Sequence, residues 1–276
     1  MDIAKTLGMP LNAAAHGARI DDMMLYMHIL MAILFVGWGT FYVYCLARFR
    51  SRRNPKADYT GVKSHVSSWL EGAVAVIEAL FLLVLAFPIW SEVKAKPPTE
   101  DQAEVVVDVV AQQFAWNVQY PGPDGKFGRR DINLVSDSNV LGLDRNDPDA
   151  KDDITTINQL NLPVDKMVLV KLTSQDVIHS LFLPEMRVKQ DAIPGMEFPV
   201  YFKPVKTGNW EIACAQLCGL SHYRMRGMLN VQTDDEYRKW LAENAPQAPE
   251  EEAAEESSSE TPEEPSTAAP PQEETK

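Results

Sequence analysis

Cysteine is scarce in this chain, with only three in 276 residues. Three thiols, one of them (Cys45) inside an apolar run, do not make the paired framework that stabilises small secreted domains. No Cys-x-x-Cys-His motif is present, which excludes a fused domain with a covalently attached c-type haem. No stretch combines basic and aromatic residues, and nucleic acid is therefore not an expected partner.

Basic residues are too few to balance the acidic ones, but the imbalance is local. The chain has a formal net charge of −13, and residues 245–276 contain ten glutamates and one lysine, a net charge of −9. The rest of the chain therefore carries only −4. The terminal stretch consists mainly of Pro, Glu, Ser and Ala, which cannot bury apolar surface, and it is predicted to be disordered. A short polar helix is expected just before it, over residues 234–244.

Two long runs contain few or no charged side chains. Met23–Leu46 spans 24 residues without one, more than a helix needs to cross a hydrocarbon layer of ~30 Å. A second run, 69–90, has tryptophan at both ends, which is typical of membrane interfaces. The sequence predicts a transmembrane hairpin over residues 23–93, with helices at about 23–47 and 69–91.

Basic residues crowd the connection between the two runs. A short loop so rich in Lys and Arg stays on the cytoplasmic side, which places residues 1–22 and everything after residue 93 outside. Residues 1–22 lack the charged start, short apolar core and cleavage site of a removed signal peptide, so we expect an external N-terminal segment. The basic residues of the connection are Arg48, Arg50, Arg52, Arg53, Lys56 and Lys63.

Two carboxylates, Glu71 and Glu78, interrupt the second run. They are seven residues apart and therefore share a helix face, with Glu78 about 10 Å deeper in the membrane. A carboxylate at the depth of Glu71 is common at a membrane surface and suits a helix N-terminus. An ionisable group at the depth of Glu78 should face protein or water, either for proton transfer or for contact with a neighbouring helix.

Beyond a linker at 94–104 the sequence changes character. Short β-branched and aromatic segments, separated by Gly, Pro and Asp, indicate a β-sandwich or barrel. We expect a membrane-anchored all-β protein whose hairpin is followed by a Greek-key, cupredoxin-like sandwich over 105–244. An acidic stretch at 144–153 matches no known cation-binding loop and is expected to be solvated. The expected strands are 105–111, 114–120, 164–173, 177–183, 198–202, 209–214 and 228–232.

The densest group of metal-binding side chains lies late in the chain, where Cys214, Cys218, His222 and Met225 fall within twelve residues. Sulfur and imidazole ligands together select copper, zinc or iron–sulfur and reject magnesium and calcium. On a tight loop between two strands these side chains can converge. Two thiolates so placed can each bridge two metal ions, and the second imidazole that this requires is available from His179.

Three other interpretations compete for these residues. Two cysteines in an oxidising compartment can form a structural disulfide. A single-copper blue site needs one cysteine, two histidines and an axial methionine, which would leave Cys214 surplus. A thioredoxin-type copper chaperone also carries Cys-x-x-x-Cys, but its histidine lies far downstream. The full set of ligands, with His179 included, favours the dinuclear centre.

The run C-x-x-x-C-x-x-x-H-x-x-M, with D-V-x-H-S upstream at 176–180, resembles the copper-ligand signature of subunit II of haem-copper oxidases of the cytochrome c oxidase type. The resemblance includes Lys189–Gly195 and covers roughly residues 23–232. It implies a mixed-valence copper A centre in which the two late cysteines bridge the coppers. It also implies one nitrogen ligand each from His179 and His222, and weak axial contacts from Met225 and the backbone carbonyl of Gln216.

The resemblance implies further roles, with two departures from the family pattern. The family's exposed tryptophan, where electrons from cytochrome c enter, is replaced by Phe114, and Trp116 corresponds to a second, more buried tryptophan. Ordinary strand packing explains both aromatic residues equally well. Gln216 replaces a glutamate that binds magnesium, and an amide is a weaker ligand for a hard ion. Asp176 resembles an acid that docks basic cytochrome c, and Glu71 lies near the mouth of a proton pathway into subunit I.

The expected function is therefore that of subunit II of a respiratory terminal oxidase in a bacterial-type plasma membrane. Such a subunit accepts single electrons from a c-type cytochrome or a c-haem-bearing neighbouring complex and passes them to haem in subunit I. There oxygen is reduced to water with proton translocation, and a third subunit completes the expected assembly. The alternatives are a quinol oxidase subunit II, which lacks the copper ligands, and a membrane-anchored copper-binding or copper-delivery protein.

Overall fold

The structure is a computed structural model that describes residues 8–56, 59–61 and 63–246. The predicted disordered tail falls almost entirely on residues 247–276, which lie outside the described residues. Before it, helix α5 (Asp234–Asn244) has the predicted bounds, and a capping box between Thr233 and Glu236 begins it.

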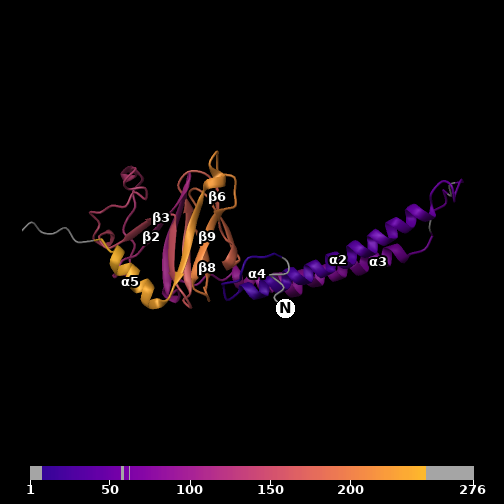
Figure 1. Ribbon diagram of the computed structural model, residues 1–276, viewed down its shortest axis with the longest axis horizontal. Helices are drawn as coiled ribbons and strands as arrows, with labels where there is room; N and C mark the ends of the chain where they lie inside the picture. Colours follow the sequence, from indigo (N-terminus) through magenta and orange to yellow (C-terminus); the bar gives the residue numbers. More distant parts are fainter. Residues whose placement is uncertain (1–7, 57–58, 62, 247–276) are drawn as a thin grey trace, which may run out of the picture. The chain divides into compact units, whose positions relative to one another are not determined.

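Two long apolar helical segments form the N-terminal part of the chain (Figure 1). The first is helix α2 (Gly17–Arg48). The second runs from helix α3 (Val66–Leu80) through a π-helical turn, η1 (Phe81–Ala86), into helix α4 (Phe87–Val93). Each is long and apolar enough to cross a membrane, and large side chains such as Phe35 remain 79% exposed.

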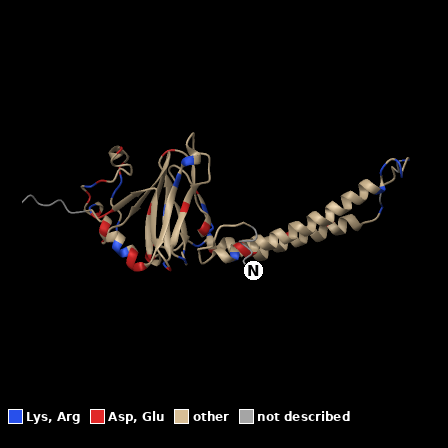
Figure 2. Ribbon diagram, viewed as in Figure 1, with Lys and Arg blue, Asp and Glu red and all other residues tan. Residues whose placement is uncertain are grey.

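The helical segments extend beyond the predicted apolar runs at both ends. Helix α2 begins at Gly17, where Arg19 forms an ion pair with Glu92 near the end of α4. The pair joins the outer ends of the two helical segments. In Figure 2 the ribbon of the connection between the two helices is coloured largely for Lys and Arg, which is the charge distribution expected of a cytoplasmic loop.

The rest of the described chain is a sandwich of two five-stranded sheets, which confirms the predicted fold class. One sheet has the order β3-β2-β1-β5-β8 and the other β4-β10-β9-β6-β7, so several neighbouring strands are distant in sequence. The strands are β1 (Val105–Gln112), β2 (Ala115–Tyr120), β3 (Ile154–Ile157), β4 (Gln159–Pro163), β5 (Val168–Ser174), β6 (His179–Leu183), β7 (Val188–Ala192), β8 (Phe198–Phe202), β9 (Gly208–Cys214) and β10 (Arg226–Gln232).

The sequence did not predict strands β3, β4 and β7. All three are edge strands, and their segments are short and rich in Thr, Gln, Asn, Lys or Asp. Because an edge strand has a neighbour on one side only, its apolar pattern is weaker than that of a central strand. These segments therefore form strands because they pair with β2, β10 and β6, and not because of their local propensity.

The expectation of a solvated acidic loop at 144–153 was wrong for two of its carboxylates. Asp153 is completely buried, and its Oδ2 accepts hydrogen bonds from Gln119 Nε2 at 2.6 Å and from the Gly128 N–H at 2.8 Å. Asp144 is only 7% exposed and pairs with Arg129. These carboxylates bind the long β2–β3 connection to itself and to the sheet, and burial without partners would be costly for them.

Candidate metal centre

Two adjacent strands bring the late cluster and His179 to the same end of the sandwich. His179 begins β6 and Cys214 ends β9, and these antiparallel strands pair with Leu181 opposite Cys214. The Ala215 N–H then donates to the Ser180 carbonyl at 3.0 Å, which holds the start of the next loop beside His179. We call residues 214–225, between β9 and β10, the ligand loop.

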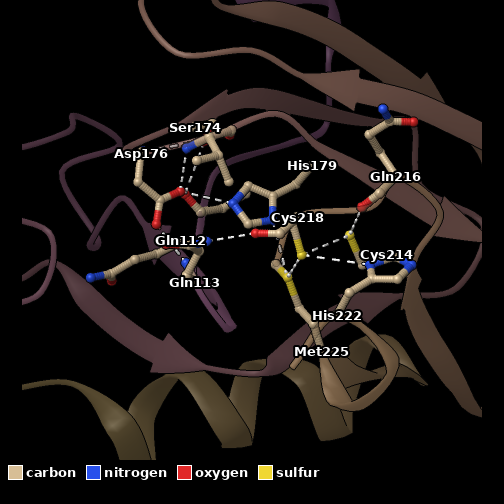
Figure 3. A network of polar contacts seen from close by, with 12 residues as sticks. Gln112, Gln113, Ser174, Asp176, His179, Cys214, Gln216, Cys218, His222 and Met225 are labelled. Atoms are coloured by element: carbon tan, nitrogen blue, oxygen red, sulfur yellow. Dashed lines mark hydrogen bonds and ion pairs between the residues drawn. The ribbon is translucent and has the colours of Figure 1, made fainter. Parts of the chain in front are cut away.

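The six predicted copper ligands lie together around this loop (Figure 3). The ligand atoms of His179, Cys214 and Cys218 all fall within 4.8 Å of one another. The two Sγ atoms are 3.9 Å apart, and Cys218 Sγ lies 3.6 Å from His222 Nδ1. The contacts of the two weaker ligands are Met225 Sδ to Cys218 Sγ at 3.7 Å, Met225 Sδ to His179 Nδ1 at 3.1 Å and the Gln216 carbonyl to Cys214 Sγ at 3.2 Å.

Both cysteines of the ligand loop are free, and their pKa values are shifted in opposite directions. Burial opposes ionisation of Cys214, but hydrogen bonds with His179 and with the backbone at Gln216 lower its pKa to about 6. Burial and the neighbouring Cys214 thiolate raise the pKa of Cys218 to about 11. Without metal the pair therefore holds one proton near neutral pH, and binding a metal to both sulfurs must release it.

His179 is oriented by Asp176, three residues before it. His179 is completely buried, and its Nε2 lies 2.8 Å from Asp176 Oδ1, which leaves Nδ1 facing the sulfur atoms. Burial would raise the pKa of Asp176, but hydrogen bonds from His179 and two backbone N–H groups keep it below its usual range. A carboxylate behind a ligand histidine fixes the ring and its tautomer.

The role of Asp176 as an orienting group was missed from the sequence. The spacing of three residues between Asp176 and His179 could have indicated this role, whereas the family resemblance assigns Asp176 to docking of the electron donor. The Asp176 side chain is 29% exposed and already engaged with His179, Gln113 and Val177. Docking of a donor at Asp176 stays a prediction.

The two aromatic candidates for electron transfer contact different parts of the cluster. Trp116 is completely buried, and its ring meets the His179 ring edge-on with centroids 6.3 Å apart. Phe114 is half-buried and packs against Gly219, so that a Cβ on Gly219 would lie 3.1 Å from its ring. Phe114 is therefore closer to the surface beside Cys218, but the part of either ring in electron transfer stays a prediction.

The two membrane glutamates lie on α3, far in sequence from the metal centre. Glu78 lines an apolar cavity of about 150 Å³ between the helical segments, together with Met23, Met27 and Phe81. Glu71 is exposed, one turn into the helix. The structure gives neither side chain a hydrogen-bond partner among the described residues, and their assignment to proton uptake stays a prediction.

The donor set fits a pair of copper ions. Two thiol sulfurs, two imidazole nitrogens, a thioether and a carbonyl converge, and soft ligands of this kind select copper over magnesium or calcium. The structural disulfide is not present, since Cys214 and Cys218 are unbonded. A single-copper site would use one sulfur, whereas here both lie within the same cluster. Fold and donor set together define a membrane-anchored, cupredoxin-like protein with a candidate copper site.

Comparisons with known proteins agree with this class. Residues 105–231 match the family model for "Cytochrome C oxidase subunit II, periplasmic domain". The alternative cytochrome c oxidase subunit 2 of Bradyrhizobium diazoefficiens is 33% identical over 83% of this chain and 82% of its own length. The chain belongs to the cytochrome c oxidase subunit II family. It is thus a membrane-anchored subunit of an oxidoreductase complex, with a periplasmic domain, in a family that implies copper A.

Two further relatives are informative about the breadth of the family. Quinol oxidase subunit 2 of Bacillus subtilis is 24% identical over 81% of this chain and 61% of its own length. A crystal structure of the periplasmic domain of subunit II of cytochrome oxidase from Bradyrhizobium japonicum is 30% identical in sequence. It covers 54% of this chain and 96% of that chain, with a TM-score of 0.40.

Proposed function

We propose that this chain carries a dinuclear copper A centre, accepts single electrons from a c-type cytochrome or c-haem-bearing complex, and passes them to haem in subunit I. The convergence of His179, His222 and both cysteines at one end of the sandwich carries the proposal. The quinol oxidase alternative is disfavoured because every side-chain ligand is present. A solitary copper-delivery protein is disfavoured by membership of the oxidase family.

Each residue of the cluster has a separate task in this proposal. Cys214 and Cys218 would hold the metals through their sulfurs, and His179 and His222 would each supply an imidazole nitrogen. Met225 and the Gln216 carbonyl would supply two weaker ligands. Bound copper would supply the one-electron chemistry, and the chain's part would be to hold these ligands in a fixed arrangement.

Residues around the candidate ligands orient them and shield them from water. Asp176 holds the His179 ring so that Nδ1 faces the sulfurs, and the buried side chains of Cys218 and Met225 exclude water. The proton held by the two cysteines leaves when both sulfurs bind. At Gln216 the side chain is an exposed amide, which is a weaker ligand for a hard ion than a carboxylate and makes a magnesium site doubtful here.

We also propose that the chain works in a bacterial plasma membrane with a haem-bearing subunit I and a third subunit. Glu71 and Glu78 would then serve proton uptake by that assembly. Oxygen reduction and proton translocation would take place in subunit I, and this chain would not itself bind oxygen.

Copper and haem counts on the intact complex, purified from its native membrane, test the proposal. We expect two coppers per chain, a near-infrared band and a seven-line paramagnetic spectrum. Cys218→Ser should abolish both spectral features, whereas Cys45→Ser, a cysteine of helix α2, should leave them unchanged. One copper per wild-type chain would refute the dinuclear centre, and isolation without any haem-bearing subunit would favour the copper-delivery alternative.

A further inference from the structure

Gln113 makes two hydrogen bonds to the candidate metal centre from outside it. It lies in the turn between β1 and β2, and its backbone N–H donates to Asp176 Oδ2 at 2.7 Å. Its side-chain Nε2 donates to the backbone carbonyl of Cys218 at 2.6 Å. Figure 3 shows both contacts, with Gln113 placed between Asp176 and the ligand loop.

The two bonds reach different metal ligands. Through Asp176, whose Oδ1 lies 2.8 Å from His179 Nε2, the backbone N–H of Gln113 supports the orientation of an imidazole ligand. Through the carbonyl of Cys218, the side chain of Gln113 supports the backbone that carries a candidate thiol ligand. One residue therefore connects the early histidine with the late loop.

The ligand loop has little other support at its tip. Within the described part of the chain, no other hydrogen bond from outside the loop reaches its backbone between Gln216 and Ser221. The loop's remaining bonds are internal, such as those from the N–H groups of His222 and Met225, or lie at its two ends. The Gln113 side chain is thus the external support for the segment that holds Cys218.

Gly219 provides the space that this contact needs. A Cβ at Gly219 would lie 2.8 Å from Gln113 Nε2, closer than such contacts normally come. A glycine directly after Cys218 therefore lets the amide approach the carbonyl. The close approach of the Gln113 amide to the Cys218 carbonyl thus depends on glycine at position 219.

We propose that Gln113 is a positioning residue for the copper pair, which fixes the backbone of Cys218 and, through Asp176, the ring of His179. This inference rests on the proposed function, because it assigns Gln113 to the same centre. Gln113 itself touches no metal in this scheme. Its effect is to hold two ligands in the arrangement that binds both coppers tightly.

The test uses the full-length chain in its purified complex, with Gln113→Leu and Gln113→Glu. Leu keeps most of the volume and removes the donor, and Glu keeps the shape but places an oxygen against the Cys218 carbonyl. Both variants retain the backbone N–H that binds Asp176. We expect copper loss to a chelator to be about 10-fold faster than in the wild type, as is typical when support behind a metal ligand is removed. The near-infrared band should also shift or broaden.

Gln112→Leu is the matched control, since the neighbouring Gln112 accepts a hydrogen bond from Asn117 Nδ2 at 3.2 Å and bonds to no residue of the ligand loop. It should release copper at the wild-type rate. The melting temperature of the copper-free chain should be the same for Gln113→Leu and wild type. An equal copper-release rate and spectrum in Gln113→Leu would overturn the inference, and so would a lowered melting temperature that accounts for the copper loss.

Measurements on the wild-type protein distinguish a failure of the proposed function from a failure of the role proposed for Gln113. If it lacks a copper pair, the proposed function fails and the role of Gln113 fails with it. If the wild type shows the pair and Gln113→Leu behaves identically, only the role of Gln113 fails.

Discussion

At the scale of single residues, a buried ionisable group affects stability most where its charged and hydrogen-bonding partners do not compensate for its burial. Asp108 on β1 is only 4% exposed and lies beneath the β2–β3 connection. Arg130 Nη2 lies 2.8 Å from its Oδ2, and Lys171 Nζ lies 3.9 Å from its Oδ1. Burial outweighs these two cations and raises the pKa of Asp108 from 3.8 to about 6. The ionised carboxylate is therefore less stable in the folded chain than in the unfolded chain.

The sign of the resulting pH dependence follows from linkage. The raised pKa stabilises the folded state fully below about pH 3.8, and this stabilisation is lost as pH rises through about 6. We expect Asp108→Asn, which cannot ionise, to gain about 3 kcal/mol of stability relative to wild type between acid and neutral pH. Unfolding midpoints of both proteins across that range measure the difference. Exposed Asp137→Asn is the control, and parallel curves for wild type and Asp108→Asn would contradict the prediction.

At the scale of elements, the ligand loop depends on the backbone as well as on its donors. Gly219 has φ +140°, a region that residues with a side chain rarely adopt. Its neighbours leave no room for a Cβ, since Gln113 Nε2 and Phe114 Cζ would lie 2.8 Å and 3.1 Å away. Glycine at this position therefore favours the loop conformation that places Cys218 and His222 together.

Gly219→Ala should consequently weaken copper binding by distorting the loop. Backbone strain of this kind costs about 1–3 kcal/mol, and the clash with Gln113 and Phe114 adds to it. We expect a lower copper content after purification and faster copper loss to a chelator. Gly125→Ala is the matched control, because Gly125 also has a positive φ of +71° but nothing within 4 Å of the added Cβ. Equal copper retention in the two variants would show that the loop tolerates the change.

At the scale of the whole molecule, the two proposed tasks lie on opposite sides of the membrane. The basic connection between the helical segments places Glu71, at the start of α3, near the cytoplasmic side. The metal centre belongs to the periplasmic domain. We therefore expect single substitutions at the two sites to impair the proposed electron acceptance and proton uptake separately.

Glu71→Gln removes the titrating group while keeping its size. We expect steady-state oxygen consumption by the complex to fall several-fold, because a carboxylate at this position would exchange protons that an amide cannot. The rate at which a reduced donor loads the copper centre should stay at its wild-type value. Stopped-flow donor oxidation and oxygen electrode rates measure the two steps, and Ser67→Ala in the same turn is the control. Unchanged oxygen consumption would remove Glu71 from the proton pathway.

The sequence by itself determined the parts that depend on local composition and spacing. Apolar runs longer than the membrane thickness, with few or no charged side chains, specify the hairpin, and β-branched segments specify the central strands of the sandwich. The spacing of the late cysteines, histidine and methionine, with His179 upstream, was sufficient to nominate the ligand cluster. Each of these signals is carried by residues close together in the chain or by their chemical type.

The tertiary structure decided what depends on residues distant in sequence. Edge strands β3, β4 and β7 form because neighbours pair with them. Asp153 is buried where its Oδ2 accepts hydrogen bonds from Gln119 and the Gly128 N–H. Gln113 contacts Cys218, more than a hundred residues later in the sequence, because β1 and β9 end at the same end of the sandwich. Local patterns cannot encode such contacts, since a hydrogen bond between distant segments exists only once the sheets have packed.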